Sequence, residues 1–268
     1  MRDRLGYASK FYRFASRLLG WSITLWREGP FVLLKLEELK QNSAKTSLPI
    51  PLKLRALKHP INIRPGTNDI NVMINNIIRR EYGKISLPAR PCLLIDAGAY
   101  IGDTSAYFLS CFPNLTCIAL EPNPVSYALA EKNLRAYGDR VTLKQVALAS
   151  TDGDVFLSGE ETGAHIDQTG GIKVPAITIS KILEEVSDCY FKILKLDIEG
   201  AEVKLFESHP ETWLTHIDQI LVETHSAHGT EIVLSALHQN GWTTRRYRNL
   251  YYCQPQQQDQ NKLDTKVS

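Results

Sequence analysis

The chain has 268 residues, enough for one sizeable α/β domain plus an extension. Hydrophobic residues make up 43% and charged residues 22% of it, the ordinary composition of a soluble globular protein. A formal net charge of +2 gives no general reason to expect nucleic-acid binding. The five cysteines are scattered and form no CxxC or Cys/His cluster, so neither a disulfide framework nor a structural zinc site is expected.

The N-terminal extension concentrates the positive charge. Residues 1–58 hold 12 Lys and Arg against 4 Asp and Glu, which leaves the rest of the chain mildly acidic. Residues 5–26 fit a helix with Lys10, Arg13 and Arg17 on one narrow face. A basic amphipathic helix of this kind can rest on an anionic membrane surface, pack on the rest of the chain or contact a second subunit. We therefore keep peripheral membrane contact and self-association as two alternative roles for this helix.

The sequence of the N-terminal region also allows a prediction of the cellular compartment. The first apolar stretch is interrupted by Arg13 and Arg17 and lacks a small-residue cleavage pattern, so no signal peptide is expected. The apolar run over residues 18–26 is too short to span a bilayer, and charged residues and a proline follow it. We therefore predict a cytoplasmic protein, with any membrane contact peripheral and at the inner face.

Short elements follow the basic helix. The pattern of residues 31–40 predicts a second helix, and the pattern of residues 41–47 predicts a polar linker. The N-terminal helical extension is therefore placed at residues 1–47. Two extended pieces, 49–54 and 61–63, open a region that we place at residues 48–90 and interpret as a lid or N-terminal subdomain.

A turn and a helix continue this lid. Pro65-Gly66 marks the turn, and Asn68 or Asp69 can cap a helix over residues 70–80. Turn and cap chemistry is a sufficient structural explanation for Arg64 and Asp69.

Residues 91–253 alternate between strand and helix patterns, which predicts a mostly parallel, doubly wound sheet. Residues 153–178 form a β-rich insertion, and the polar tail 254–268 is expected to be disordered. The predicted strands are 92–96, 117–121, 141–147, 191–196, 219–222, 242–248 and 251–253, and the predicted helices are 102–111, 123–137, 179–187, 201–207 and 230–239.

The first strand, glycine turn and helix resemble the opening of a nucleotide-binding βαβ unit, but the charges around the turn do not suit a diphosphate. Asp96 ends the strand and Asp103 lies in the first helical turn, while Glu121 ends the second strand where a ribose would bind. Two carboxylates beside the turn would repel a diphosphate and suit a ligand with an ammonium, a sulfonium and a ribose. The motif therefore favours S-adenosylmethionine over NAD.

Ligands of open α/β sheets bind beyond the carboxyl ends of the strands, so the polar residues there are the site candidates. Asp197 follows one buried strand directly, in the segment Asp197-Ile-Glu-Gly-Ala-Glu202. Glu223 and His225 end the next strand, with the carboxylate placed to orient and polarise the imidazole. We expect all strand-end side chains to project into one crevice. The others are Asp96, Glu121 and Gln145.

These residues together resemble the FkbM-type S-adenosylmethionine-dependent methyltransferases, over roughly residues 61–242. The glycine loop alone is weak evidence, but five matching segments in the same order are specific. They are Arg64-Pro-Gly-Thr-Asn-Asp69, Asp96-Ala-Gly-Ala-Tyr-Ile-Gly102, Glu121-Pro-Asn-Pro124, Leu196-Asp-Ile-Glu-Gly-Ala-Glu202 and Glu223-Thr-His225.

The resemblance implies a Rossmann-like class I methyltransferase fold: a mostly parallel seven-stranded sheet with helices on both faces, here with an N-terminal helical extension. It also implies residues for the cofactor, with Asp96, Gly98 and Gly102 lining the methionine moiety and Glu121 binding the ribose. Tyr100 departs from the family, which usually has asparagine at this place in the loop. Asn123 and the strand end at Gln145 and Ala147 would flank the adenine.

The activity that the resemblance implies is O-methylation of a hydroxyl, commonly on a sugar of a glycan or natural product. We predict His225 as the base that removes the hydroxyl proton, Glu223 as the residue that orients it, and Asp197 as the residue that positions the acceptor. Asp197 as the base is the alternative. The metal requirement is open: Asp197, Glu199 and Glu223 could host a cation, but no ligand spacing demands one, and no metal residue is assigned.

Three other functions are weighed against this one. A domain that binds S-adenosylmethionine without catalysis is disfavoured by Asp197 and His225, which suggest a working site. A nucleic-acid methyltransferase would need a basic, aromatic-lined groove, whereas the core is slightly acidic. An NAD-dependent oxidoreductase is the enzyme alternative. The expected partner is a small-molecule or glycan acceptor, with no nucleic acid.

Overall fold

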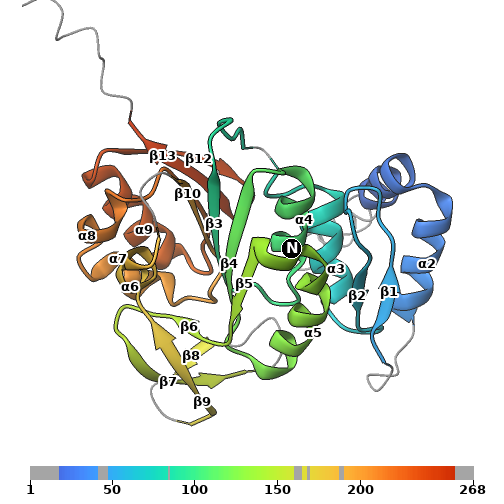
Figure 1. Ribbon diagram of the computed structural model, residues 1–268, viewed down its shortest axis with the longest axis horizontal. Coiled ribbons are helices and arrows are strands. Elements are labelled where there is room, and N and C mark those ends of the chain that lie inside the picture. Colours follow the sequence, from blue (N-terminus) through green and yellow to red (C-terminus); the bar gives the residue numbers. More distant parts are fainter. Residues whose placement is uncertain are drawn as a thin grey trace, which may run out of the picture.

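The computed structural model confirms the α/β fold with a seven-stranded, mostly parallel sheet (Figure 1). It describes residues 18–41, 48–83, 85–159, 165–167, 170–186 and 190–256. The strand order is β12-β13-β11-β10-β3-β4-β5, and β13 alone runs against the other six. The strands are β3 (Cys92–Ala97), β4 (Leu115–Leu120), β5 (Val141–Lys144), β10 (Phe191–Leu196), β11 (Gln219–Glu223), β12 (Trp242–Tyr247) and β13 (Leu250–Pro255).

Helices cover both faces of the sheet, so its central strands are buried along their whole length. All six residues of β3 are buried, as expected for a parallel strand between two helical layers. Alternate residues of β3 enter different cores: Leu94 packs toward α4 and α5, and Ile95 packs toward the helices of the other face. The helices are α4 (Asp103–Cys111) and α5 (Pro124–Leu134) on the first face and α6 (Ile179–Glu184), α7 (Glu202–Glu207), α8 (Glu211–Leu214) and α9 (Ala227–Gln239) on the second.

Most of the predicted elements are present, with differences at their ends. The helix predicted over 123–137 ends at Leu134 and continues as the 3-10 helix η2 (Arg135–Arg140). The last helix begins at Ala227, three residues before its predicted start, because the hydroxyl of Ser226 accepts the N–H of Gly229 as an N-cap. The short helix α8 was not predicted.

The strand predicted over 141–147 divides between two sheets. β5 stops at Lys144, and β6 (Ala147–Leu148) pairs instead with β9 (Ile172–Ile177). With β7 (Gly153–Ser158) and β8 (His165–Asp167) these strands form a separate four-stranded sheet, in the order β6-β9-β7-β8. The predicted β-rich insertion therefore exists, and it begins at the carboxyl end of the main sheet.

The N-terminal part packs on the first face of the sheet. Residues 18–28 are helical, Gly29 forms a corner, and α2 (Pro30–Gln41) follows. A two-stranded ribbon, β1 (Ile50–Leu52) with β2 (Ile61–Ile63), leads to α3 (Asp69–Met73), which continues as the π-helix η1 (Ile74–Ile78). Leu36, Ile63 and Ile77 share a core with the sheet residue Leu94, so the predicted lid is packed on the sheet.

The two ends of the chain lie largely outside the described residues. The basic face predicted for Lys10, Arg13 and Arg17, the linker after Gln41 and most of the predicted tail belong to those parts. The tail as predicted began too early, because Gln254 and Pro255 still belong to β13. Among the helices of the described chain, none combines the length and the apolar character needed to cross a bilayer.

Candidate active site

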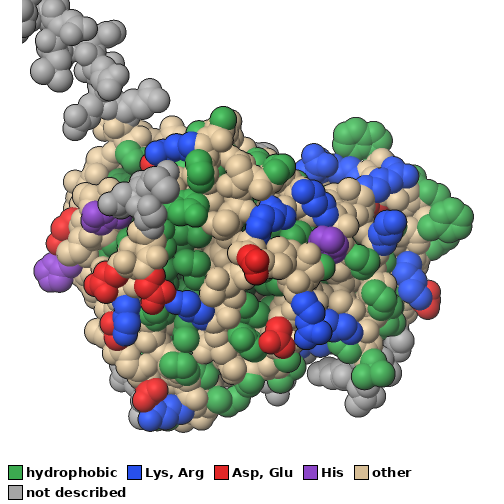
Figure 2. All heavy atoms as spheres, viewed as in Figure 1, with side chains coloured by type: hydrophobic (Ala, Val, Ile, Leu, Met, Phe, Trp, Pro, Cys, Tyr) green, Lys and Arg blue, Asp and Glu red, His purple; other side chains and the backbone are tan. Residues whose placement is uncertain are grey.

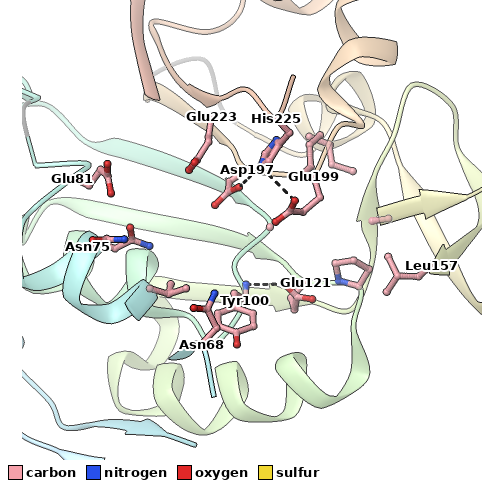
Figure 3. Close-up of a pocket in the computed structure, with 17 residues that line it drawn as sticks. Asn68, Asn75, Glu81, Tyr100, Glu121, Leu157, Asp197, Glu199, Glu223 and His225 are labelled. Carbon is pink, nitrogen blue, oxygen red and sulfur yellow. Dashed lines mark hydrogen bonds and ion pairs between the residues drawn. The ribbon is translucent and has the colours of Figure 1, made fainter. Parts of the chain in front are cut away.

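A cavity of about 320 Å³ opens at the carboxyl ends of β3, β4, β10 and β11, where the topology predicts a ligand site (Figure 3). Four of its acidic side chains come from the strand ends and the loops that follow them, and the fifth, Glu81, comes from the segment after η1. Its amide side chains come from the start of α3 and from η1, and its apolar end is completed by the insertion. The lining residues are Asn68, Val72, Asn75, Asn76, Glu81, Gly98, Tyr100, Glu121, Pro122, Ala147, Leu148, Leu157, Asp197, Ile198, Glu199, Glu223 and His225.

The charge of this lining is strongly one-sided. Five carboxylates face the cavity, and the described lining includes one histidine but no lysine or arginine. The cavity is therefore acidic, as expected for the crevice. Its acidic residues are not Asp96 and Asp103, the two beside the glycine turn on which that expectation was based.

Asp96 lies beneath the cavity, not in it. Its side chain is fully buried, accepts the hydroxyl of Ser105 at 2.6 Å, and lies 3.1 Å from the ammonium of Lys195. Lys195 also donates to the carbonyl oxygen of Gly98 at 2.6 Å, which fixes the underside of the glycine loop. The expectation that Asp96 projects into the crevice is thus corrected: the neighbouring strand supplies its partner, and its charge is neutralised below the loop.

Asp103 is also buried, with an exposed fraction of 2%, and it does not line the cavity. Its carboxylate accepts the amide N–H of Asn76 at 2.8 Å. Burial raises the pKa of Asp103 to about 6, against the opposing effect of this hydrogen bond. Asp103 therefore ties α4 to η1 and contributes little to the charge of the cavity.

The glycine loop between β3 and α4 is held in conformations that favour glycine. Gly98 has a φ of +77°, and a Cβ built there would lie 1.9 Å from the carbonyl oxygen of Asp197. The loop therefore lies directly on the segment that follows β10. Gly102 has a φ of +78° and forms the N-cap of α4, where a Cβ would meet the side chain of Leu134. Gly98 lines the cavity as predicted, whereas Gly102 faces α5.

Glu121 occupies the predicted position at the end of β4 and lines the cavity. Its two carboxylate oxygens accept the backbone N–H groups of Tyr100 at 2.7 Å and Asn123 at 2.8 Å. Burial raises the pKa of Glu121 to about 7, although both hydrogen bonds oppose the rise. Because each carboxylate oxygen has further lone pairs, the group can still accept hydrogen bonds from two ribose hydroxyls.

The predicted adenine contacts are only partly brought together. Ala147 lines the cavity beside Leu148 and Leu157. Asn123 does not line it, because its side chain caps α5 by accepting the N–H groups of Val125 and Ser126. Gln145 is exposed and lies outside the lining, since the chain leaves the main sheet at this point.

The hydroxyl group of Tyr100 gives a structural reason for a tyrosine at this place in the loop, where asparagine was expected. The backbone at Tyr100 has a φ of +50°, which is uncommon for a residue other than glycine. Its hydroxyl donates to Asp69 at 2.5 Å and accepts from the guanidinium of Arg64 at 2.9 Å. Arg64 and Asp69 are themselves paired at 2.7 Å. These two residues therefore do more than form a turn and a cap, because they anchor the lid to the glycine loop.

We expect Tyr100→Phe to lower the free energy of unfolding by about 1.5–3 kcal/mol, because it removes hydrogen bonds to two charged groups in a buried cluster. Urea denaturation monitored by circular dichroism measures this change. Tyr127→Phe is the control, since no hydrogen bond of the Tyr127 hydroxyl is found among the described residues. Equal stability of both variants would show that the cluster does not hold the lid.

His225 is surrounded by carboxylates on both ring nitrogens. Its Nδ1 lies 3.1 Å from Glu202, which is almost fully buried, and its Nε2 lies 3.3 Å from Asp197 and 3.6 Å from Glu199. Burial alone would lower the pKa of His225, but the hydrogen bonds to Asp197 and Glu202 raise it to about 10. The imidazole is therefore a cation at neutral pH. The prediction that Glu223 orients it is wrong, because Glu202 makes that contact.

Glu223 lies beside this network without joining it (Figure 3). Among the described residues, no hydrogen bond or ion pair of its carboxylate is found. Burial raises the pKa of Glu223 to about 7, and the charge of Asp197 adds to the rise. Glu81 acts in the same direction, whereas His225 and Lys195 oppose it. The cavity thus contains a carboxylate that changes its protonation near neutral pH.

Asp197, Glu199 and His225 have ligand-type atoms within 4.8 Å of one another. The imidazolium of His225 lies between the two carboxylates and compensates their charge. The same three side chains are a group that could hold a metal ion, with His225 in the place that the sequence analysis assigned to Glu223.

The wall opposite the acidic strand ends was not predicted as part of a site. Asn75 and Asn76 reach the cavity from η1, and Asn68 reaches it from the start of α3 (Figure 3). A π-helical turn is uncommon and often occurs at functional sites, where it redirects side chains. The motif Arg64–Asp69 lies just before this wall in the sequence and was the only signal near it. The contact between the wall and the strand ends could not be predicted, because it depends on packing between residues far apart in the chain.

The family comparison and the two curated relatives all name methyltransferases. Residues 96–248 match the family model described as the Methyltransferase FkbM domain. The chain is 25% identical over 197 residues to Methyltransferase sdnD of Sordaria araneosa, which covers 58% of this chain and 74% of that protein. It is also 25% identical over 157 residues to Methyltransferase 1 of Beauveria bassiana, covering 48% of this chain and 63% of that protein.

Among solved structures, the methyltransferase FkbM of Methylobacillus flagellatus KT is similar at 15% identity with a TM-score of 0.48. The match covers 69% of this chain and 53% of that one, so the chain spans about half the length of the bacterial protein.

Proposed function

The chain belongs to the FkbM methyltransferase family, and from this we propose that it transfers a methyl group from S-adenosylmethionine to a hydroxyl oxygen, on a sugar of a glycan or of a natural product. The observation that carries the proposal is the one-sided charge of the cavity. Five carboxylates and no lysine or arginine face it among the described residues. Such a lining favours a cationic nucleoside and disfavours a diphosphate.

The residues present fit S-adenosylmethionine at each part of the cavity. Ala147, Leu148 and Leu157 provide an apolar end for a base, and Glu121 lies where the hydroxyls of a ribose need acceptors. The carboxylates of Asp197 and Glu199 line the cavity between this apolar end and Glu81, and they favour positive charge there (Figure 3). The cavity of about 320 Å³ is at the lower end of the size range of small-molecule sites.

S-adenosylmethionine, when bound, supplies a methyl group already activated by its sulfonium: the C–O bond forms, the C–S bond breaks with its electron pair going to sulfur, and the hydroxyl proton must leave. The protein provides two things for this step. Its rigid walls hold the acceptor in line with the methyl group, and a base accepts the proton.

We assign the role of base to Glu223. The sequence pointed to His225, but a histidine with a pKa of about 10, hydrogen-bonded through both nitrogens, holds its proton at neutral pH. Glu223 has a pKa of about 7 and lines the cavity, so a substantial fraction of its carboxylate is ionised and basic at neutral pH. His225 then serves as a fixed cation that keeps Asp197 ionised and in place, and Glu202 orients it.

The acceptor class is supported by the amide wall. The side chains of Asn68 and Asn75 combine donors and acceptors, which suits a ligand with several hydroxyl groups. Asn76 adds an acceptor oxygen, since its amide N–H groups bond to Asp103 and Thr104. Glu81 completes this wall with a carboxylate acceptor. An aromatic acceptor would instead favour aromatic walls, and Tyr100 is the one aromatic residue in the described lining.

The test is a methyl-transfer assay with S-adenosylmethionine labelled at the methyl group and a panel of sugars, glycosides, amino sugars and phenols. We expect label in methyl ethers of the sugar or glycoside hydroxyls, identified by mass spectrometry. Transfer to the amino group alone, or to phenols alone, would contradict the proposed acceptor. Binding of S-adenosylmethionine without transfer to any acceptor would favour a binding module, and binding of NAD would favour an oxidoreductase.

A further inference from the structure

The largest exposed hydrophobic side chains gather at the N-terminal end of the described chain. Trp26 is 78% exposed, Phe31 is 85% exposed and Leu34 is 68% exposed, with Leu18, Leu19 and Leu25 on the same helices. Single exposed apolar residues are normal, but a group that includes two large aromatic side chains indicates an interaction surface.

These side chains surround one sharp corner in the backbone. The helix over residues 18–28 ends at Gly29, whose φ of +91° turns the chain into α2 at Pro30. The N–H of Gly29 bonds to the carbonyl oxygen of Leu25 at 3.1 Å, which closes the last helical turn. Trp26 precedes the corner and Phe31 follows it. We call these two residues with Leu25 and Leu34 the aromatic tip.

Positively charged side chains lie near the aromatic tip. The guanidinium of Arg27 lies 5.7 Å from the centre of the Trp26 ring and donates to the carbonyl oxygen of Ile78, so it is held on the protein side of the tip. Arg55 reaches the corner from the ribbon, where it donates to the carbonyl oxygen of Arg27 at 3.4 Å. Lys53 is exposed two residues before Arg55. Figure 2 shows Lys and Arg side chains interspersed with hydrophobic ones over the end of the molecule that carries α2 in Figure 1.

The acid nearest the corner points inward. Glu28 has an exposed fraction of 7%, and its carboxylate accepts the backbone N–H of Arg55 at 2.7 Å. Its charge is therefore turned away from the surface that the tip presents. Glu38 is the exposed acid on α2, and it is paired with Lys35 at 3.0 Å.

We propose that the aromatic tip inserts into the interfacial region of an anionic membrane, with Lys53 and Arg55 facing the lipid headgroups. Tryptophan prefers the level of the headgroups, where its ring is buried and its N–H remains hydrated. Basic residues near an anionic surface add electrostatic attraction. Residues 1–17 of the sequence hold five Lys and Arg against one Asp, which is charge of the same sign.

An anionic membrane fits these features better than a second copy of the chain does. Two copies that met through the aromatic tip would bring Lys53 and Arg55 of each chain close to those of the other. Like charges across an interface oppose association, whereas anionic headgroups neutralise them. The inference is independent of the proposed methyl transfer, since no residue of the aromatic tip lines the cavity.

The test uses the full chain and sedimentation with vesicles of phosphatidylcholine alone or with 30% phosphatidylglycerol. We expect binding to the anionic vesicles, at least tenfold weaker binding to the neutral ones, and a loss on raising the salt concentration. The double variant Trp26→Ser, Phe31→Ser and the charge-reversed variant Lys53→Glu, Arg55→Glu should each reduce the partition coefficient at least tenfold. Ile172→Ser is the matched control, because Ile172 is 53% exposed on β9 and should not affect binding.

The emission of Trp26 gives a second measurement. Trp213 and Trp242 are buried, and the indole N–H of Trp21 is bonded to Glu37, whereas Trp26 is 78% exposed. A shift to shorter wavelength on adding vesicles should therefore come mainly from Trp26, and Trp26→Phe should abolish it. No binding to anionic vesicles, equal binding to neutral ones, or unchanged binding of the Trp26→Ser, Phe31→Ser variant would overturn the proposal. A dimer in light scattering that this double variant dissociates would also overturn it, and would assign the aromatic tip to self-association.

Discussion

We expect Glu223→Gln to lower kcat for methyl transfer by about 10²- to 10⁴-fold, the usual contribution of a positioned general base. Glutamine has the same shape but cannot accept the hydroxyl proton. The affinity for S-adenosylmethionine should change little, because Glu223 lies away from the proposed ribose and adenine contacts at Glu121 and Ala147. Steady-state kinetics with the acceptor found in the panel, together with calorimetry, separate the two effects.

The pH dependence of the same variant provides its control. Because a base acts only when ionised, kcat/KM of the wild type should rise with pH around the Glu223 pKa of about 7 and level off above it. Glu223→Gln should lose this rise. Asp197→Asn should move it to lower pH, since the Asp197 charge raises the pKa of Glu223. An unchanged rise in Glu223→Gln would assign the base to another group.

The second large effect concerns the buried charge beneath the glycine loop. We expect Lys195→Met to lower the free energy of unfolding by about 3–5 kcal/mol, because it leaves the fully buried carboxylate of Asp96 without its counter-charge. Burial alone would lower the pKa of Lys195, but Asp96 and Asp197 raise it above its usual value, so Lys195 keeps its positive charge in the folded protein. Urea denaturation measures the loss.

The double variant Lys195→Met, Asp96→Asn shows whether the unpaired charge is the cause. A neutral amide can keep the hydrogen bond from Ser105 that Asp96 now accepts. We therefore expect the double variant to recover at least half of the stability lost in Lys195→Met. If the double variant is as unstable as the sum of the two single variants, the pair does not act as a unit.

The fold was predictable because its signals are local. Apolar runs such as Phe191–Leu196 can be read from the sequence, and the structure has this strand with the same bounds. The strand predicted over 141–147 was wrong at its end, because no local signal shows that Ala147 pairs with Ala176 in a second sheet. The conversion of the helix after Asp69 into a π-helix at Ile74–Ile78 was likewise not visible in the pattern.

The site was predictable to the extent that it depends on strand ends. Glu121, Asp197 and Glu223 each follow an apolar run, and all three line the cavity. Asp96 follows the same rule but is enclosed, because β3 and β10 are neighbours and their register places Lys195 opposite Asp96. Which strands are neighbours is decided by contacts about 100 residues apart, and no local pattern contains it.

The roles around His225 needed the structure for the same reason. Glu202 reads in the sequence as a favourable charge in the first turn of a helix. In the fold it is almost fully buried and holds Nδ1 of a histidine 23 residues away. This contact changes the role proposed for His225 from base to fixed cation and shifts the role of base to Glu223.

Calorimetric titration of S-adenosylmethionine into the wild type and Glu121→Gln tests most directly whether the acidic crevice is a site for a cationic nucleoside without phosphate. The account predicts one molecule bound per wild-type chain, at least tenfold weaker binding to the variant, and no measurable heat with NAD. Binding of NAD in place of S-adenosylmethionine, or equal affinity of both proteins for S-adenosylmethionine, would contradict it.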